Sequence, residues 1–247
     1  MFRRREHDGP RNVVPALHNH QRDDDYSRME TIMKTDLELR QDVDRELAWD
    51  PKLDASKVTV TANNGVVTLA GQVKSYLEKS EAEGVAKRVL GVTGIANDID
   101  VVLGRKVDDT DLTERILNAL KWNASVPSDK IKPIVRDGWV TLDGTVKWKY
   151  QKDAAEHAVE YLHGVKGVTN SILIDNPVEP KDVSKRITES LIRNARIDAQ
   201  QISVKARGHT AVLDGSVRSW PERDEAEMAA WAAPGVTSVE NHLSVRP

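Results

Sequence analysis

The pattern of apolar positions along the chain repeats three times. Near the start of each repeat, apolar residues recur at every fourth position, which is typical of an amphipathic helix with one buried stripe. These positions are Leu39, Val43 and Leu47 in the first copy, Leu112, Ile116 and Leu120 in the second, and Val183, Ile187 and Leu191 in the third. Such a recurrence indicates tandem copies of one folding unit.

A hairpin is expected after each first helix. In the first copy, apolar and polar residues alternate on both sides of Asn63-Asn64-Gly65, a turn sequence that favours a β-hairpin. The segment 65–71, GVVTLAG, returns at 138–144 as GWVTLDG and at 209–215 as HTAVLDG. We therefore expect two strands in every copy. We assign a structural role to the glycine that closes the second strand, which is Gly71, Gly144 or Gly215.

A second helix and a third strand complete each copy. Capping-box sequences mark the helix starts, at Thr35 with Glu38 and Asp111 with Glu114 for first helices, and at Ser75 with Glu78 and Ser219 with Glu222 for second helices. Helices commonly end at glycine, so the second helices are expected to stop at the structural glycines Gly91, Gly164 and Gly235. The last strands are expected over residues 95–102, 168–174 and 239–245.

These elements predict an α+β protein of three tandem αββαβ domains. Each domain is expected to be a three-stranded mixed sheet with two helices packed on one face. The predicted domains cover residues 35–102, 110–175 and 181–247. Residues 1–32 are expected to be a disordered leader. Met33 stands directly before the first repeat and is an alternative translation start, from which that leader would be absent.

Composition narrows the classes of partner. Lys plus Arg total 36 against 39 Asp plus Glu, so no whole-molecule attraction to nucleic acid is expected. The chain has no cysteine, which excludes disulfides and thiol chemistry. No apolar run is long enough for a transmembrane segment. The sequence shows no export signal, so a cytoplasmic location is expected.

The αββαβ order, the glycine of the second strand and the Gly-Val-x-Gly-Val turn into the last strand resemble the BON domain of OsmY-like bacterial proteins. The resemblance covers nearly all of residues 35–247. It implies a non-catalytic module that attaches to phospholipid and is linked to osmotic or envelope stress or to transport. Because many relatives are exported, it also implies a periplasmic location as the alternative.

No catalytic constellation is apparent in the sequence. Repeated active sites would place reactive residues at equivalent positions, yet the histidines at 157, 163, 209 and 242 fall at unrelated ones. We therefore expect no enzyme activity, no cofactor and no metal site. The Gly-x-x-Gly at 91–94 and 164–167 suggests RNA binding by analogy with KH domains, but here it joins a helix to a strand, and no nucleic-acid partner is expected.

The start of each second helix is the candidate binding site. A basic residue, an aromatic residue and a helix N-terminus coincide there, which suits an anionic phospholipid headgroup. The candidate residues are Lys74 and Tyr76, then Lys147, Trp148, Lys149 and Tyr150, then Arg218 and Trp220. Trp148 and Tyr150 make the middle copy the first choice.

A second interpretation of these aromatics is that they cover a sheet edge or pack between neighbouring domains. Trp49 and Trp122, at the end of the first helices, are expected to close the core, and Trp139 is expected on an exposed or interdomain face. The sequence thus predicts a non-enzymatic protein with an anionic phospholipid surface or a protein as partner. Its alternatives are a chaperone-like interaction scaffold and a small-ligand or ion sensor.

Overall fold

A computed structural model describes residues 34–104, 107–175, 182–194 and 197–246. Lys34–Pro247 form one compact unit. We name the described parts the first domain (34–104), the middle domain (107–175) and the third domain (182–246). The predictions for residues 1–32 lie outside the described residues.

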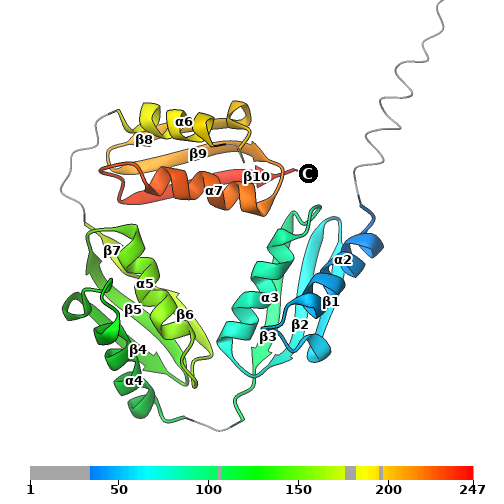
Figure 1. Ribbon diagram of the computed structural model, residues 1–247, viewed down its shortest axis with the longest axis vertical. Helices are drawn as coiled ribbons and strands as arrows, with labels where there is room; N and C mark the ends of the chain where they lie inside the picture. The colour runs from blue at the N-terminus through cyan, green and yellow to red at the C-terminus, as the bar shows by residue number, and fades with distance from the viewer. Residues whose placement is uncertain (1–33, 105–106, 176–181, 195–196, 247) are drawn as a thin grey trace, which may run out of the picture. The chain divides into compact units, whose positions relative to one another are not determined.

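The three domains repeat one order of elements (Figure 1). The first contains α2 (Asp36–Trp49), β1 (Val58–Asn63), β2 (Val66–Val73), α3 (Tyr76–Arg88) and β3 (Gly94–Val101). The middle one contains α4 (Asp109–Trp122), β4 (Ile131–Arg136), β5 (Trp139–Val146), α5 (Lys149–Glu160), β6 (Gly167–Asn170) and β7 (Leu173–Ile174). The third contains α6 (Val183–Arg193), β8 (Ile202–Arg207), β9 (Thr210–Val217), α7 (Trp220–Trp231) and β10 (Ser238–Val245).

Each sheet is mixed, as predicted. The second strand lies in the centre, antiparallel to the first strand and parallel to the last, in β1-β2-β3, β4-β5-β6 and β8-β9-β10. In the middle domain the last strand is interrupted, and β7 continues the pairing with β5. In every domain both helices cover the same face of the sheet (Figure 1). The fold class predicted from sequence is therefore confirmed.

Each domain has its own hydrophobic core between its helices and its sheet. The predicted stripes of the first helices are buried in all three domains. They meet the inward-facing residues of the central strand, such as Val67 and Leu69 in the first domain and Val140 and Leu142 in the middle domain. The four-residue spacing read from sequence thus marks one side of each core.

The first two hairpins turn through residues with positive φ. Asn64 and Gly65 have φ of 50° and 79°, the combination that a type I′ turn requires. The Asp36 carboxylate, in the first turn of α2, accepts hydrogen bonds from the backbone N–H groups of Asn64 (2.9 Å) and Gly65 (3.2 Å). The equivalent Asp109 does the same in the middle domain. The first helix therefore anchors the hairpin, a link that sequence reasoning missed.

The glycines expected to close the second strands lie inside them. Gly71 pairs with Val58, the first residue of β1, and has φ of 132°. A Cβ at Gly71 would come within 2.0 Å of the Lys57 carbonyl oxygen. Gly144 and Gly215 repeat this approach, at 2.1 Å from the Lys130 and Gln201 carbonyls. The expectation of a strand end was wrong, because the glycine admits the incoming backbone of the neighbouring strand.

Two other predicted boundaries need correction. The Thr35 capping box is confirmed, but α4 begins after Asp108, whose side chain accepts from the Thr110 N–H, and the box expected at Asp111 does not form. The second helices stop before their glycines: α3 ends at Arg88, and Gly91 lies in the following turn with φ of 102°. A Cβ at Gly91 would meet Leu39 and Lys34 only at ordinary contact distance, so it is the positive φ that favours glycine there.

Candidate functional site

The start of α3 is capped and partly covered. Ser75 is the N-cap, and its hydroxyl accepts a hydrogen bond from the Glu78 N–H. Lys74 pairs with Asp54 at 3.1 Å. Tyr76 is half-buried and packs against the core of the middle domain. Burial raises the pKa of the Tyr76 phenol, with a smaller contribution from the nearby Glu156 carboxylate.

The start of α7 shows the same arrangement with a tryptophan. Ser219 caps the helix, and Trp220 packs against the core of the first domain. The Lys87 ammonium lies 5.6 Å from the centroid of the Trp220 ring, and the Arg223 guanidinium lies 5.3 Å from it. The cation of this site, Arg218, pairs with Glu222 at 3.4 Å. The predicted aromatic and its basic neighbours therefore already have partners in the protein.

Glu222 is a buried carboxylate behind this helix start, with only 5% of its surface exposed. It accepts hydrogen bonds from the N–H groups of Asp198 (2.8 Å) and Arg218 (2.7 Å). Burial acts to raise the pKa of Glu222, but these hydrogen bonds and the Arg218 charge outweigh burial and hold the pKa below its ordinary value.

The start of α5 differs because Trp148 occupies the N-cap position. An indole cannot accept the hydrogen bonds that serine accepts, and the Gln151 side chain accepts from the Lys147 and Trp148 N–H groups instead. Trp148 is 45% exposed and Tyr150 58% exposed. Lys149 pairs with Asp153. This is the helix start whose aromatics stay most accessible to a ligand.

An open pocket of about 370 Å³ lies beside the start of α5. Its lining is mainly apolar and also contains two lysines and the carboxylate of Asp153. The lining includes Lys147, Trp148, Lys149, Tyr150, Met228 and Trp231. The Lys149 ammonium lies 5.5 Å from the centroid of the Trp231 ring. The four candidate residues of the middle domain therefore meet around one cavity, whereas those of the other two domains do not line it.

Trp49 and Trp122 do not close the core, and this prediction was wrong. They are 87% and 85% exposed. Each lies two positions beyond the last buried residue of its helix, Leu47 or Leu120. Two helical positions turn the side chain by about 200°, which carries it to the solvent side.

Trp139 lies on the open face of the middle sheet, as expected, and is 52% exposed. Its indole N–H donates to the Thr169 hydroxyl at 2.9 Å. A Cβ at Gly167 would come within 2.4 Å of the ring, so the ring lies flat over that glycine. The neighbouring Ile134 is 49% exposed. Together they form an apolar area on a face otherwise rich in threonine and charge.

A polar pair at equivalent positions recurs in all three domains and was missed from sequence. An asparagine on the last strand donates through its amide to a glutamate on the second helix. The pairs are Asn97 with Glu83 (3.3 Å), Asn170 with Glu156 (3.0 Å) and Asn241 with Glu227 (2.8 Å). These residues recur at the same spacing as the apolar repeat positions, so an alignment of the three repeats that includes polar positions would have identified them. These hydrogen bonds tie the second helix to the last strand in each domain.

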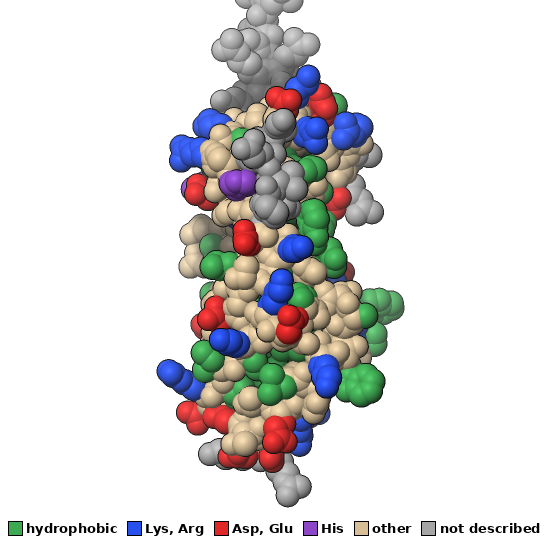
Figure 2. Space-filling view, turned by 90° about the vertical axis from the view of Figure 1, so that its left-hand side faces the viewer, with side chains coloured by type: hydrophobic (Ala, Val, Ile, Leu, Met, Phe, Trp, Pro, Cys, Tyr) green, Lys and Arg blue, Asp and Glu red, His purple; other side chains and the backbone are tan. Residues whose placement is uncertain are grey.

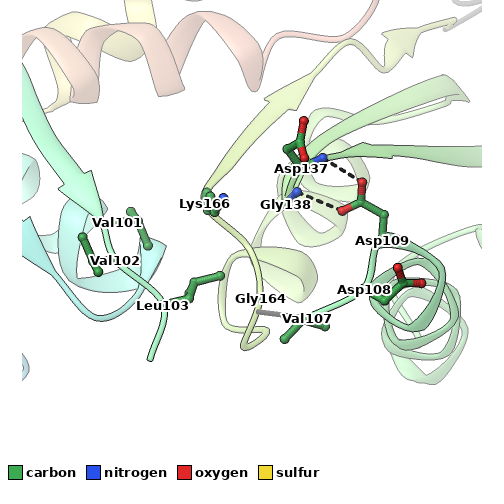
Figure 3. Close-up of a pocket in the computed structure, with 10 residues that line it drawn as sticks. All are labelled: Val101, Val102, Leu103, Val107, Asp108, Asp109, Asp137, Gly138, Gly164 and Lys166. Atoms are coloured by element: carbon green, nitrogen blue, oxygen red, sulfur yellow. Dashed lines mark hydrogen bonds between the residues drawn. The ribbon is translucent and has the colours of Figure 1, made fainter. Parts of the chain in front are cut away.

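Another pocket, of about 490 Å³, is lined by residues 101–103 at the end of β3 and by the hairpin turn of the middle domain. Figure 3 shows the Asp109 carboxylate directed at the N–H groups of Asp137 and Gly138. These hydrogen bonds, of 2.7 and 3.0 Å, engage both of its oxygens. We therefore assign the Asp109 carboxylate to hairpin anchoring.

Charge is mixed over the surface. On the face shown in Figure 2, Lys and Arg side chains are interspersed with Asp and Glu side chains, and hydrophobic side chains lie among them. Any attraction for an anion on that face must come from a local group of residues. Within the described ranges, no group of three or more His, Asp or Glu side chains is placed to hold a metal ion. No helix among the described residues is long and apolar enough to cross a membrane.

The chain is similar to two characterised bacterial proteins. Osmotically-inducible protein Y of Escherichia coli (strain K12) is 34% identical over 126 residues, which cover 49% of this chain and 63% of that protein. The match thus spans just under two thirds of that relative. The 21 kDa hemolysin of Actinobacillus pleuropneumoniae is 30% identical over 146 residues, which cover 57% of this chain and 73% of that protein.

Among solved structures, the C-terminal domain of CdsD, the structural protein of the type III secretion system of Chlamydia trachomatis, is 18% identical. The comparison covers 87% of this chain and all of that chain with a TM-score of 0.24, which is too low to support an argument. The sequence model of the BON domain family matches residues 35–102, 108–176 and 181–247. The repeat pattern, the three mixed sheets and this match agree, and the chain belongs to the BON domain family, with three BON domains in tandem.

Proposed function

We propose that this protein is a non-enzymatic, peripheral phospholipid-binding protein of the osmotic or envelope stress response. Membership of the BON family and similarity to Osmotically-inducible protein Y and to a 21 kDa hemolysin support the stress and envelope part of the proposal. The lipid contact itself is supported by one observation, the pocket beside the start of α5.

That pocket combines the two properties that an anionic phospholipid requires. Trp148, Tyr150 and Trp231 offer rings that suit the boundary between headgroup and acyl chain, where an aromatic keeps its polar atom wet. Lys147 supplies positive charge at the same cavity, while the charge of Lys149 is offset by its ion pair with Asp153. A basic residue near an anionic surface contributes about 1 kcal/mol, so the attachment is weak and sensitive to salt.

The other two helix starts contribute less to this proposal. Lys74 and Arg218 are paired with carboxylates. Tyr76 and Trp220 pack against neighbouring domains. Lipid contact at these sites requires the protein to give up contacts that it already makes. The middle domain is therefore the expected contact.

Liposome co-sedimentation of the full chain tests the proposal. We expect binding to vesicles that contain anionic lipid, weak binding to neutral vesicles and loss of binding at high salt. Replacing Trp148 and Tyr150 by alanine should abolish binding. The matched control replaces Trp49 and Trp122, two aromatics that are more exposed but do not line the pocket, and should retain binding. Equal loss in both variants, or no binding to any vesicle, contradicts the proposed site.

A second candidate function is protein binding through the open sheet of the middle domain. The observation that favours it is the apolar area made by Trp139 and Ile134, which protein surfaces often use for association. A Trp139→Ala variant tests it. Loss of a stoichiometric protein partner with unchanged liposome binding favours this function over the lipid one, and unchanged partner binding contradicts it.

A further inference from the structure

The start of the second helix in one domain lies beside the end of the second helix in a different domain. Tyr76, Lys149 and Trp220 all open the second helix of their domain. Lys87, Glu160 and Trp231 all lie near the end of the second helix. Tyr76 lies near Glu160 of the middle domain, and Lys149 lies near Trp231 of the third domain. Trp220 lies near Lys87 of the first domain.

The chemistry of two of these contacts is reversed. At the contact of the middle and third domains, the helix start supplies the cation, Lys149, and the helix end supplies the ring, Trp231, at 5.5 Å. At the contact of the third and first domains, the helix start supplies the ring, Trp220, and the helix end supplies the cation, Lys87, at 5.6 Å. A cation over an indole is attractive, whereas two cations at this position would repel.

The contact of the first and middle domains uses a third combination. Tyr76 at the helix start packs on the core of the middle domain, and the carboxylates of Glu156 and Glu160 lie near its phenol. The charge around this helix start is therefore negative, unlike the charge at the other two contacts. The three equivalent positions thus have three different kinds of neighbour.

Burial agrees with a formed contact. Trp220 packs on the core of the first domain, and α3 and α7 are in contact. The Trp220 indole N–H is buried without a hydrogen-bond partner in the described residues. A buried unpaired donor is costly, so apolar packing of the ring must hold it in place.

We propose that the start of the second helix in each BON domain is a docking site for the end of the second helix in another BON domain, and that the cation–ring pairs Lys149–Trp231 and Trp220–Lys87 fix which domain docks on which. The partner is the next domain of the same chain. This inference does not rest on the proposed lipid binding, although Lys149 and Trp231 belong to both, since they line the pocket beside the start of α5.

Cross-linking of the full chain tests the docking order. Because the chain has no cysteine, two introduced thiols are the only targets of a bifunctional maleimide. The pair Tyr150→Cys with Met228→Cys brackets the middle-to-third contact, since both residues line its pocket. Gly84 is the first-domain equivalent of Met228, so Tyr150→Cys with Gly84→Cys tests the reversed order. The pair Pro221→Cys with Gly84→Cys tests the third-to-first contact.

We expect rapid cross-linking within the chain for the two matched pairs and little for the reversed pair. Equal cross-linking of the reversed pair, or covalent dimers between chains in place of the internal product, would overturn the proposal.

Exchange of the partners tests the specificity. Trp231→Lys places two cations together and should slow cross-linking of the 150–228 pair by about fivefold to tenfold. Adding Lys149→Trp restores a ring and a cation in reversed order, as at the third-to-first contact, and should restore the rate. Circular dichroism shows that each variant is folded. An unchanged rate with Trp231→Lys, or no rescue by the second change, overturns the assignment of specificity to this pair.

Discussion

The helix starts of the middle and third domains occupy the same repeat position and differ in almost every side chain. At the third, Ser219 caps α7 and Trp220 is covered by the first domain. At the middle, Trp148 takes the place of the capping serine, and the exposed Tyr150 lies beside it on an open pocket. In both, the N-cap residue has an extended backbone and the helix is 12 residues long. The comparison shows that the BON scaffold fixes the helix start while its surface diverges between a covered and an accessible form.

The largest expected effect comes from replacing the glycine of the central strand, a feature that the two domains share. Gly215→Ala places a Cβ about where the Gln201 carbonyl oxygen now lies, and φ of 132° disfavours alanine. We expect a loss of about 3 kcal/mol or more in the stability of the third domain. Chemical denaturation measures it. Gly144→Ala should have the same effect in the middle domain, because its geometry is equivalent.

The matched control is Gly84→Ala. Gly84 is helical, and a Cβ there meets nothing within 4 Å, so alanine should stabilise α3 by about 0.5–1 kcal/mol. A similar small effect of Gly215→Ala would contradict the close approach between strands.

The second prediction separates the covered tryptophan from the accessible one. Trp220→Ala removes a ring packed on the core of the first domain and should cost about 2–3 kcal/mol. Trp148→Ala removes a ring that is 45% exposed and should cost less than about 1 kcal/mol. Denaturation curves of both variants test the contrast. Equal losses would show that the two helix starts do not differ in cover.

Local rules explain what the sequence predicted well. The helix stripe at Leu39, Val43 and Leu47 and the hairpin at Asn64-Gly65 depend on spacing and backbone preference within a few residues. The structure has both of them. The exposure of Trp49 follows from helix geometry and needed only a count of positions from Leu47.

Packing between distant segments explains what the sequence missed. The Asn97–Glu83 hydrogen bond joins a strand to a helix, and polar residues that recur in a repeat look like ordinary surface until both elements are placed. The cover over Trp220 comes from a domain at the other end of the described chain. Helix capping shows the same limit, because Trp148 lacks the hydroxyl half of a capping box while Gln151 still supplies the other half, by accepting from the Trp148 N–H.

The smallest effect concerns the residue behind the two helix starts, which is Glu222 in the third domain and Gln151 in the middle domain. Glu222 accepts from the Asp198 N–H as well as from the Arg218 N–H. The middle domain has Pro127 at the position equivalent to Asp198, and proline has no N–H to donate. The neutral amide of Gln151 therefore lacks the donor that Asp198 provides in the third domain. The Glu222 carboxylate accepts that additional hydrogen bond.

Glu222→Gln should cost about 1–2 kcal/mol at pH 7, because the amide loses the charge that strengthens these hydrogen bonds. The folded-state pKa of Glu222 lies below its ordinary value, so its contribution is present above the unfolded pKa and is lost as the pH falls through the folded pKa. The difference between wild type and variant should thus shrink on acidification below about pH 4. Gln151→Glu, with no added donor to meet it, should gain little at any pH. A stability difference for Glu222→Gln that stays constant from pH 7 to strong acid would show that the carboxylate acts there through its shape alone.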